Sequence, residues 1–187
     1  MPAMVDIFGA FVLSVLLALQ VMQLSDQAAA YYYGSSLACI AQGNGETLAA
    51  ILAEDLRKIG FRAAGTSVML ADSTRIQFLA DLGADGTVDT LLYYVDDPID
   101  SGNTPNPADR TLFRRVNSAP PEDLQMGVTA FRLRYLDAAG GTLSPSAPPA
   151  AIRQIRVDMT VESMVAYDTT YAKACVYFRI RPRNLRP

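Results

Sequence analysis

The sequence lacks histidine altogether and has only two cysteines among its 187 residues. Without histidine there is no Ser-His-Asp or Cys-His catalytic arrangement, and the commonest metal ligand in proteins is missing as well. Cys39 and Cys175 lie far apart and form no C-x-x-C motif, so neither a zinc site nor a thioredoxin-like redox pair is indicated. These absences argue against an enzyme, and we assign no catalytic residue.

The two cysteines leave two interpretations open. In an oxidising compartment a disulfide between Cys39 and Cys175 would close a long loop, which contributes about 4–5 kcal/mol in the chain-entropy model. Alternatively, both remain free thiols that are buried like small apolar side chains.

Positive charge is missing from the first part of the chain, where the first Lys or Arg is Arg57. Half of all residues are hydrophobic and the formal net charge is −3, which excludes a disordered chain and a generally basic, nucleic-acid-binding surface. The length predicts a single domain with, at most, an appendage.

The amino-terminal segment is strongly apolar. From Ile7 to Leu19 only Ser14 interrupts the run, and apolar residues continue to Leu24 with Gln20 and Gln23 between them. As a helix, residues 7–24 would be about 27 Å long, close to the ~30 Å hydrocarbon thickness of a bilayer. The polar side chains favour a helix that packs against copies of itself over a permanent lipid anchor. We predict that the surface of this helix is formed by Ile7, Phe8, Phe11, Val12, Val15, Leu16 and Leu19.

Two alternatives exist for this segment. A secretory signal peptide would be cleaved near Ala28–Ala30, but such peptides begin with a basic region, which is absent here. A buried core helix of a soluble protein is the other alternative.

The helix is predicted to continue, since residues 25–61 contain no proline. Apolar residues recur there at steps of three and four, namely Leu48, Ile51, Leu52, Leu56 and Ile59. The opposite side is charged, with Glu54, Asp55, Arg57 and Lys58. We expect a kink or a melted turn at Gly43-Asn44-Gly45 and a stop at Gly60.

After Gly65 the apolar pattern changes to alternation, which predicts half-buried antiparallel strands. The expected strands are residues 75–79, 88–95, 111–116, 131–135, 154–162 and 175–180. An amphipathic helix covering one face of such a sheet gives an α+β fold. The chain is thus divided into an apolar helix (1–25), its amphipathic continuation (26–61) and an antiparallel sheet domain (62–187).

Several stretches in this order resemble the type IV pilin and pseudopilin family, in particular W-type minor pilins and the J-type minor pseudopilins of type II secretion. They are LAAILAEDLRKIGFRAAG (48–65), residues 71–97, LFRRV (112–116), residues 127–143, IRQIRVDMTVES (152–163) and RIRPRNL (179–185). The opening MPAMVDIFGAFVLSV departs from the family pattern Gly-Phe-Thr-Leu-x-Glu. Asp6 is the only carboxylate before Asp26, so it is the candidate for the intersubunit charge of that glutamate.

The resemblance implies a structural subunit of a type IV pilus or a type II secretion pseudopilus. Its partners would be copies of itself or other pilin-like subunits in a helical filament. It would be held in the bacterial inner membrane before assembly and then lie in a periplasmic or extracellular filament at the cell surface. The alternative is an exported or membrane-tethered soluble module for binding or adhesion.

Three further groups of residues have both a functional and a structural interpretation. Asp81, Asp85 and Asp89 have the spacing of a calcium loop, whereas Asp85-Gly86 between strands also predicts a simple hairpin turn. Tyr31-Tyr32-Tyr33 follows the apolar segment, where an interfacial aromatic belt or a filament contact would lie. The carboxy-terminal arginines would bind nucleic acid or form a solvated edge, and they are Arg179, Arg181, Arg183 and Arg186.

Overall fold

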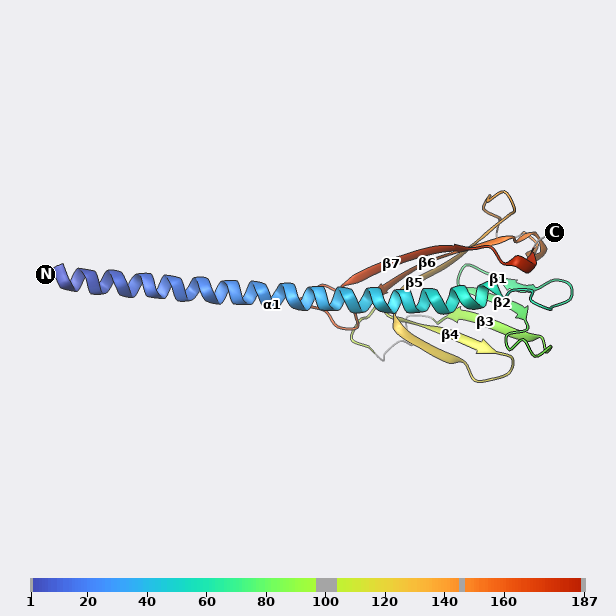
Figure 1. The fold of residues 1–187 in the computed structure, drawn as a ribbon, viewed down its shortest axis with the longest axis horizontal. Coiled ribbons are helices and arrows are strands. Elements are labelled where there is room, and N and C mark those ends of the chain that lie inside the picture. The colour runs from blue at the N-terminus through green and yellow to red at the C-terminus, as the bar shows by residue number, and fades with distance from the viewer. Residues whose placement is uncertain (1, 97–103, 145–146, 186–187) are drawn as a thin grey trace.

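The computed structural model describes residues 2–96, 104–144 and 147–185. One helix, α1 (Pro2–Arg57), runs without interruption for 56 residues, and its first half projects away from the rest of the molecule (Figure 1). The predicted kink or melted turn at Gly43-Asn44-Gly45 is wrong, because these residues are helical like their neighbours. Gly45 is buried against the sheet, where an added Cβ would lie 2.8 Å from a methyl group of Val176. The glycine lets the helix approach the sheet closely, and this packing supports a straight helix.

The helix ends close to the predicted stop at Gly60. Lys58, Ile59 and Gly60 form a turn, and Gly60 adopts a left-handed backbone conformation with φ of 76°. The Gly60 N–H donates to the carbonyl oxygen of Leu79 (2.9 Å). Glycine adopts such a conformation without strain, so the chain can leave the helix and enter the sheet at this point.

The sheet domain consists of seven strands, each hydrogen-bonded to the next along the chain. All pairs are antiparallel, which is the simplest meander topology. The strands are β1 (Val68–Ala71), β2 (Arg75–Ala80), β3 (Asp89–Val95), β4 (Arg110–Val116), β5 (Glu122–Leu136), β6 (Gln154–Glu162) and β7 (Lys173–Ile180). Two short 3-10 helices follow β5 and β7, namely η2 (Pro149–Ala151) and η3 (Arg183–Leu185).

Each predicted strand is present, whereas β1 and the first half of β5 were not predicted. In β6 the alternation is confirmed, because Ile155, Val157, Met159 and Val161 are buried. The short β1 carries too few alternating residues to give a periodic signal.

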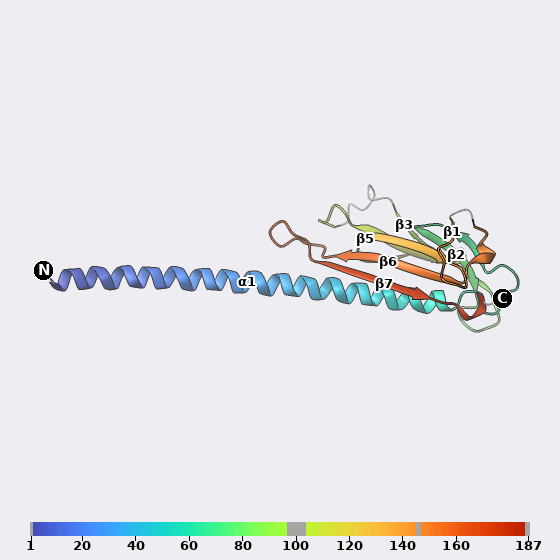
Figure 2. The same ribbon diagram turned by 90° about the horizontal axis from the view of Figure 1, so that it is seen from above.

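The core lies between the second half of α1 and one face of the sheet (Figures 1 and 2). The helix contributes Ala41, Leu48, Leu52 and Leu56, and the turn after it contributes Ile59, all almost fully buried. The sheet contributes inward residues such as Phe78, Leu91, Tyr93, Leu112 and Val157. The α+β architecture is therefore confirmed and is consistent with a pilin-like fold. Asp55 is an exception to the predicted charged side, because it is buried rather than exposed.

Candidate functional site

The first half of α1 is apolar and makes no contact with the sheet domain (Figure 2). The seven predicted residues of this surface are all exposed, from 42% for Val15 to 69% for Ile7. Leu13 and Leu17, which point to other sides of the helix, are 62% and 64% exposed. The segment is thus apolar on every side, which is typical of helices that are surrounded by lipid or by other helices.

By length and composition, this helix is able to cross a membrane, since its most apolar window has a mean hydropathy of 2.2 and none of it is buried. A signal sequence near the amino terminus has the same properties. The alternative of a buried core helix is wrong for the isolated chain.

The polar residues of the apolar segment differ in how they are paired. The Ser14 hydroxyl donates to the Ala10 carbonyl oxygen (2.8 Å), so it is paired within its own helix. Gln20 and Gln23 line a shallow hollow with Leu17, Val21, Leu24 and Gln27. In the part of the chain that the structure describes, the side-chain amides of Gln20 and Gln23 have no hydrogen-bond partner. Such amides are suited to hydrogen bonds between neighbouring helices.

Asp6 lies on α1, just before the apolar run, with its side chain exposed. An intersubunit role for its carboxylate stays a prediction.

A buried polar cluster fixes the second half of α1 to the sheet. Tyr93 donates its hydroxyl to Asp55 Oδ2 (2.6 Å), and Arg114 Nε donates to the same oxygen (2.8 Å). Arg114 also pairs with Glu122 through Nη1 (3.0 Å). Burial, with the nearby Asp55 carboxylate, raises the pKa of Tyr93 well above its ordinary value, so the hydroxyl stays protonated. Burial acts to lower the pKa of Arg114, but the contact with Asp55 outweighs it and raises that pKa.

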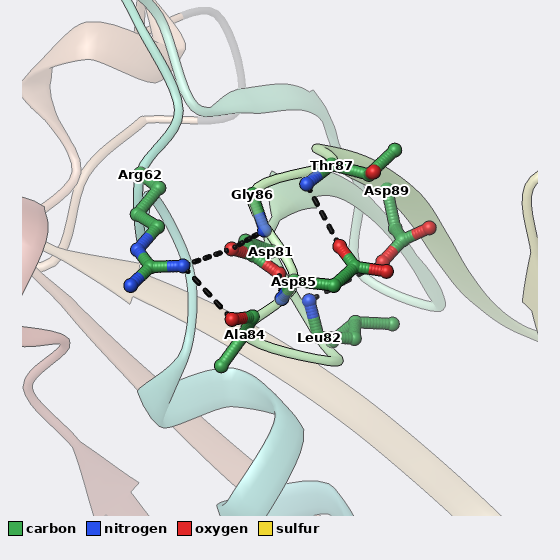
Figure 3. A network of polar contacts seen from close by, with 8 residues as sticks. All are labelled: Arg62, Asp81, Leu82, Ala84, Asp85, Gly86, Thr87 and Asp89. Atoms are coloured by element: carbon green, nitrogen blue, oxygen red, sulfur yellow. Dashed lines mark hydrogen bonds and ion pairs between the residues drawn. The ribbon is translucent and has the colours of Figure 1, made fainter.

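The three candidate calcium ligands lie at the connection between β2 and β3, where Asp81 follows β2, Asp85 lies in the loop and Asp89 begins β3 (Figure 3). The Asp81 carboxylate accepts hydrogen bonds from the backbone N–H groups of Asp85 (3.1 Å) and Gly86 (2.9 Å) and pairs with Arg62 (2.9 Å). Burial, the largest single influence, acts to raise the pKa of Asp81. The bonds from Gly86 and Arg62 together outweigh it and lower the pKa.

The other two aspartates of this connection also accept hydrogen bonds from backbone groups. Asp85 accepts from the Thr87 N–H (2.8 Å), and Asp89 accepts from the Leu82 N–H (3.2 Å) and from the side chain of Asn117 (2.8 Å). Among residues 2–96, 104–144 and 147–185, no three acidic or cysteine side chains are grouped to hold a metal ion. The geometry favours the hairpin interpretation over the calcium loop.

The carboxy-terminal arginines line a hollow of about 400 Å³ at the far end of the sheet domain. Arg179, Arg181 and Arg183 are joined there by Arg57 from the last turn of α1, which was not predicted. All four are exposed, and within the described residues none of them forms an ion pair. Arg186 lies outside the described residues. Anion binding, including nucleic acid, stays a prediction for this hollow.

Cys39 and Cys175 are free in the structure, and both are exposed. The interpretation as buried thiols is therefore wrong. Cys175 lines a hollow between α1 and β7 together with Gln42 and Glu46.

No model of a known protein family matches this chain, and neither does any curated protein. The resemblance to pilins therefore rests on the sequence pattern and on the architecture described above.

Proposed function

We propose that this chain is a structural subunit of a type IV pilus-like or type II secretion pseudopilus filament, assembled through its apolar amino-terminal helix. One observation carries the proposal. A single continuous helix packs one face on its sheet along one half and is apolar and uncovered along the other half. The head domain is complete without the exposed half, so that half is available for lipid or for other subunits.

The energetics favour this role. Burial of a large apolar side chain stabilises by about 1.5–3 kcal/mol, and a dozen such side chains between Ile7 and Leu24 are exposed. In the inner membrane the lipid would bury them, and in a filament neighbouring helices would do so. The unpaired amides of Gln20 and Gln23 favour neighbouring helices, because lipid offers them no hydrogen-bond partner.

The contact between subunits would be heterologous, joining different faces of two copies or of two related chains. Such a contact does not close on itself and therefore extends into a filament. The sheet domain would face outward, in the periplasm or outside the cell.

Assembly is tested with Leu16→Asp, which places a carboxylate in the middle of the apolar half, where Leu16 is 53% exposed. Its matched control is Val88→Asp, which changes an exposed apolar residue (41%) in the β2–β3 loop of the head domain. We expect Leu16→Asp to abolish sheared surface filaments while the sheet domain stays folded, and Val88→Asp to assemble normally. Normal filaments of Leu16→Asp would refute the proposal.

Intact mass and amino-terminal sequencing of the protein from filaments and membranes separate the two functions considered. A mature form that keeps residues 7–24 supports the subunit. A soluble mature form that begins near Ala30 supports the exported binding module instead.

A further inference from the structure

The end of the head domain that faces the apolar half of α1 carries a group of exposed apolar and aromatic side chains. We define this collar as Tyr31, Tyr32 and Tyr33 of α1 with Met164, Val165 and Tyr167 of the β6–β7 connection. The three helix tyrosines are 59–81% exposed and the three loop residues are 40–49% exposed. Figure 2 shows the β6–β7 connection at this end of the sheet, beside α1.

The loop part of the collar is held in place by specific contacts. The rings of Tyr33 and Tyr167 are stacked, with centroids 6.0 Å apart and an angle of 13° between the ring planes. Ser163 accepts from the Ala172 N–H (3.0 Å) and donates from its hydroxyl to the Val165 carbonyl oxygen (2.8 Å). The exposed apolar side chains are therefore presented by an ordered loop that is tied to the helix.

The collar has little positive charge. Asp26 and Asp168 lie near it in the sequence, and no Lys or Arg precedes Arg57. Lys173, at the start of β7, is paired with Glu162 (3.6 Å). A partner that the collar binds must accept aromatic and apolar side chains without relying on net negative charge, and the interfacial layer of a zwitterionic bilayer has this chemistry.

The distance along α1 places the collar at the membrane surface. From Leu24 the helix rises about 10 Å to Tyr31 and about 13 Å to Tyr33. If residues 7–24 are centred in the hydrocarbon, Leu24 lies about 1.5 Å inside its boundary. The headgroup layer is about 5–7.5 Å thick on each side, so it extends roughly 7–9 Å beyond Leu24 and the tyrosines lie just above it. Helix side chains lean toward the amino terminus, so the tyrosine rings lie closer to the membrane than their Cα atoms. Transmembrane helices are tilted by about 20° from the bilayer normal on average, and such a tilt brings one side of the head domain closer to the lipid.

We propose that the collar is a docking surface for the zwitterionic headgroup layer of the membrane in which α1 is anchored. The head domain then rests on the bilayer before assembly, with its orientation set by the stack of Tyr33 on Tyr167. This inference rests on the proposed membrane-anchored subunit, and it adds the surface by which the head contacts the lipid.

The test uses single tryptophans in the full chain, which has no native tryptophan. Val165→Trp reports on the collar, Val88→Trp on the opposite end of the head, and Leu16→Trp on insertion of the helix. Each variant is reconstituted in phosphatidylcholine vesicles containing lipid with a nitroxide quencher on either the headgroup or the acyl chain. We expect headgroup nitroxide to quench Val165→Trp severalfold more than Val88→Trp, and acyl-chain nitroxide to quench Leu16→Trp.

Further outcomes distinguish docking on lipid from contact with a second copy and from failure of the anchor. Adding Tyr33→Ala to Val165→Trp should reduce the quenching, because the stack with Tyr167 is lost. If Val165→Trp is quenched no more than Val88→Trp while Leu16→Trp is quenched, docking of the collar on lipid is refuted and the membrane anchor is retained. If acyl-chain nitroxide does not quench Leu16→Trp, α1 does not anchor the chain in the membrane, and the proposed docking of the collar is refuted with it. If headgroup nitroxide does not quench Val165→Trp and its emission instead shifts to the blue as the protein density rises, a second copy covers the collar, which overturns the proposal.

Lipid charge gives an independent readout. Because the collar lacks free positive charge, replacing part of the phosphatidylcholine by phosphatidylglycerol should leave the quenching of Val165→Trp unchanged or lower. A marked increase that salt abolishes would show that a basic surface of the head docks instead, which contradicts the proposal.

Discussion

Gly43 and Gly45 lie two residues apart in α1 but differ in their surroundings, and this difference predicts that the same substitution stabilises the protein at Gly43 but not at Gly45. Gly43 is exposed, and a Cβ added there would have no atom within 4 Å. At Gly45 an added Cβ would lie 2.8 Å from Cγ2 of Val176 and 3.7 Å from Cγ2 of Val161. The first position is open to solvent, whereas the second is pressed against the sheet.

The magnitudes follow from two opposing effects. Alanine stabilises a helix by about 1 kcal/mol relative to glycine, so Gly43→Ala should raise the free energy of unfolding by about that amount. Gly45→Ala has the same helical advantage, but overpacking of a core contact costs about 1–3 kcal/mol. The β-branched Val176 has little rotational freedom with which to avoid the new methyl group. We therefore expect Gly45→Ala to be about 1–3 kcal/mol less stable than Gly43→Ala.

The assay is thermal unfolding of the full chain in detergent, followed by circular dichroism. For a chain of this size, 1 kcal/mol shifts the Tm by about 2–4 °C, so the two variants should be clearly separated. In the double variant Gly45→Ala/Val176→Ala the overlap is removed, and the two changes should show favourable coupling in a double-mutant cycle. If Gly45→Ala stabilises as much as Gly43→Ala, the close approach of α1 to β7 is refuted.

Three other contacts give further predictions. Tyr93→Phe removes the hydroxyl bonded to the Asp55 carboxylate and should lower the free energy of unfolding by about 1.5–3 kcal/mol in urea titrations. The pKa of Asp81 is lowered in the folded state, so its charged carboxylate contributes stability that is present above the ordinary pKa of 3.8 and lost as the pH falls through the lower folded pKa. Asp81→Asn should therefore be less stable than the wild type near neutral pH, and the difference should shrink in acid. If the arginine hollow binds single-stranded DNA through four phosphate contacts, the slope of log K against log salt is about −2.8, and Arg179→Ala/Arg181→Ala should halve it.

Each of these predictions has a control in the same chain. Tyr94→Phe removes a hydroxyl that has no hydrogen-bond partner in the described part of the chain, and it should be close to neutral. Asp168→Asn changes an exposed aspartate and should leave the pH dependence as it is. Arg115→Ala removes an exposed arginine of β4, away from the hollow, and should not change DNA binding. Equal effects of a control and its test variant would contradict the corresponding contact.

The sequence predicted those features of the fold that depend on local periodicity. Ile155, Val157, Met159 and Val161 alternate with polar residues, and a period of two reports directly which face of a strand is buried. The apolar run from Ile7 to Leu24 likewise predicted a long uncovered helix from composition alone.

Features that depend on contacts between distant parts of the chain were not predictable in this way. Asp55 stands among charged neighbours and looked solvent-exposed, but its partners Tyr93 and Arg114 are 38 and 59 residues further along the chain. Arg57 joins the carboxy-terminal arginines only because α1 packs beside β7. A local pattern contains no information about which strand a helix will meet.

The same distinction applies to the polar residues of the apolar helix. Ser14, Gln20 and Gln23 interrupt the apolar run in the same way in the sequence, yet the structure separates them. Ser14 is paired with its own backbone and can stay in lipid at little cost, whereas Gln20 and Gln23 have amides without a partner in the described residues. Interhelical hydrogen bonds of this kind contribute about 1 kcal/mol each in membranes. Exchange of lipid for neighbouring helices would therefore be favoured most at these two glutamines, at the end of the apolar half that is closest to the head domain.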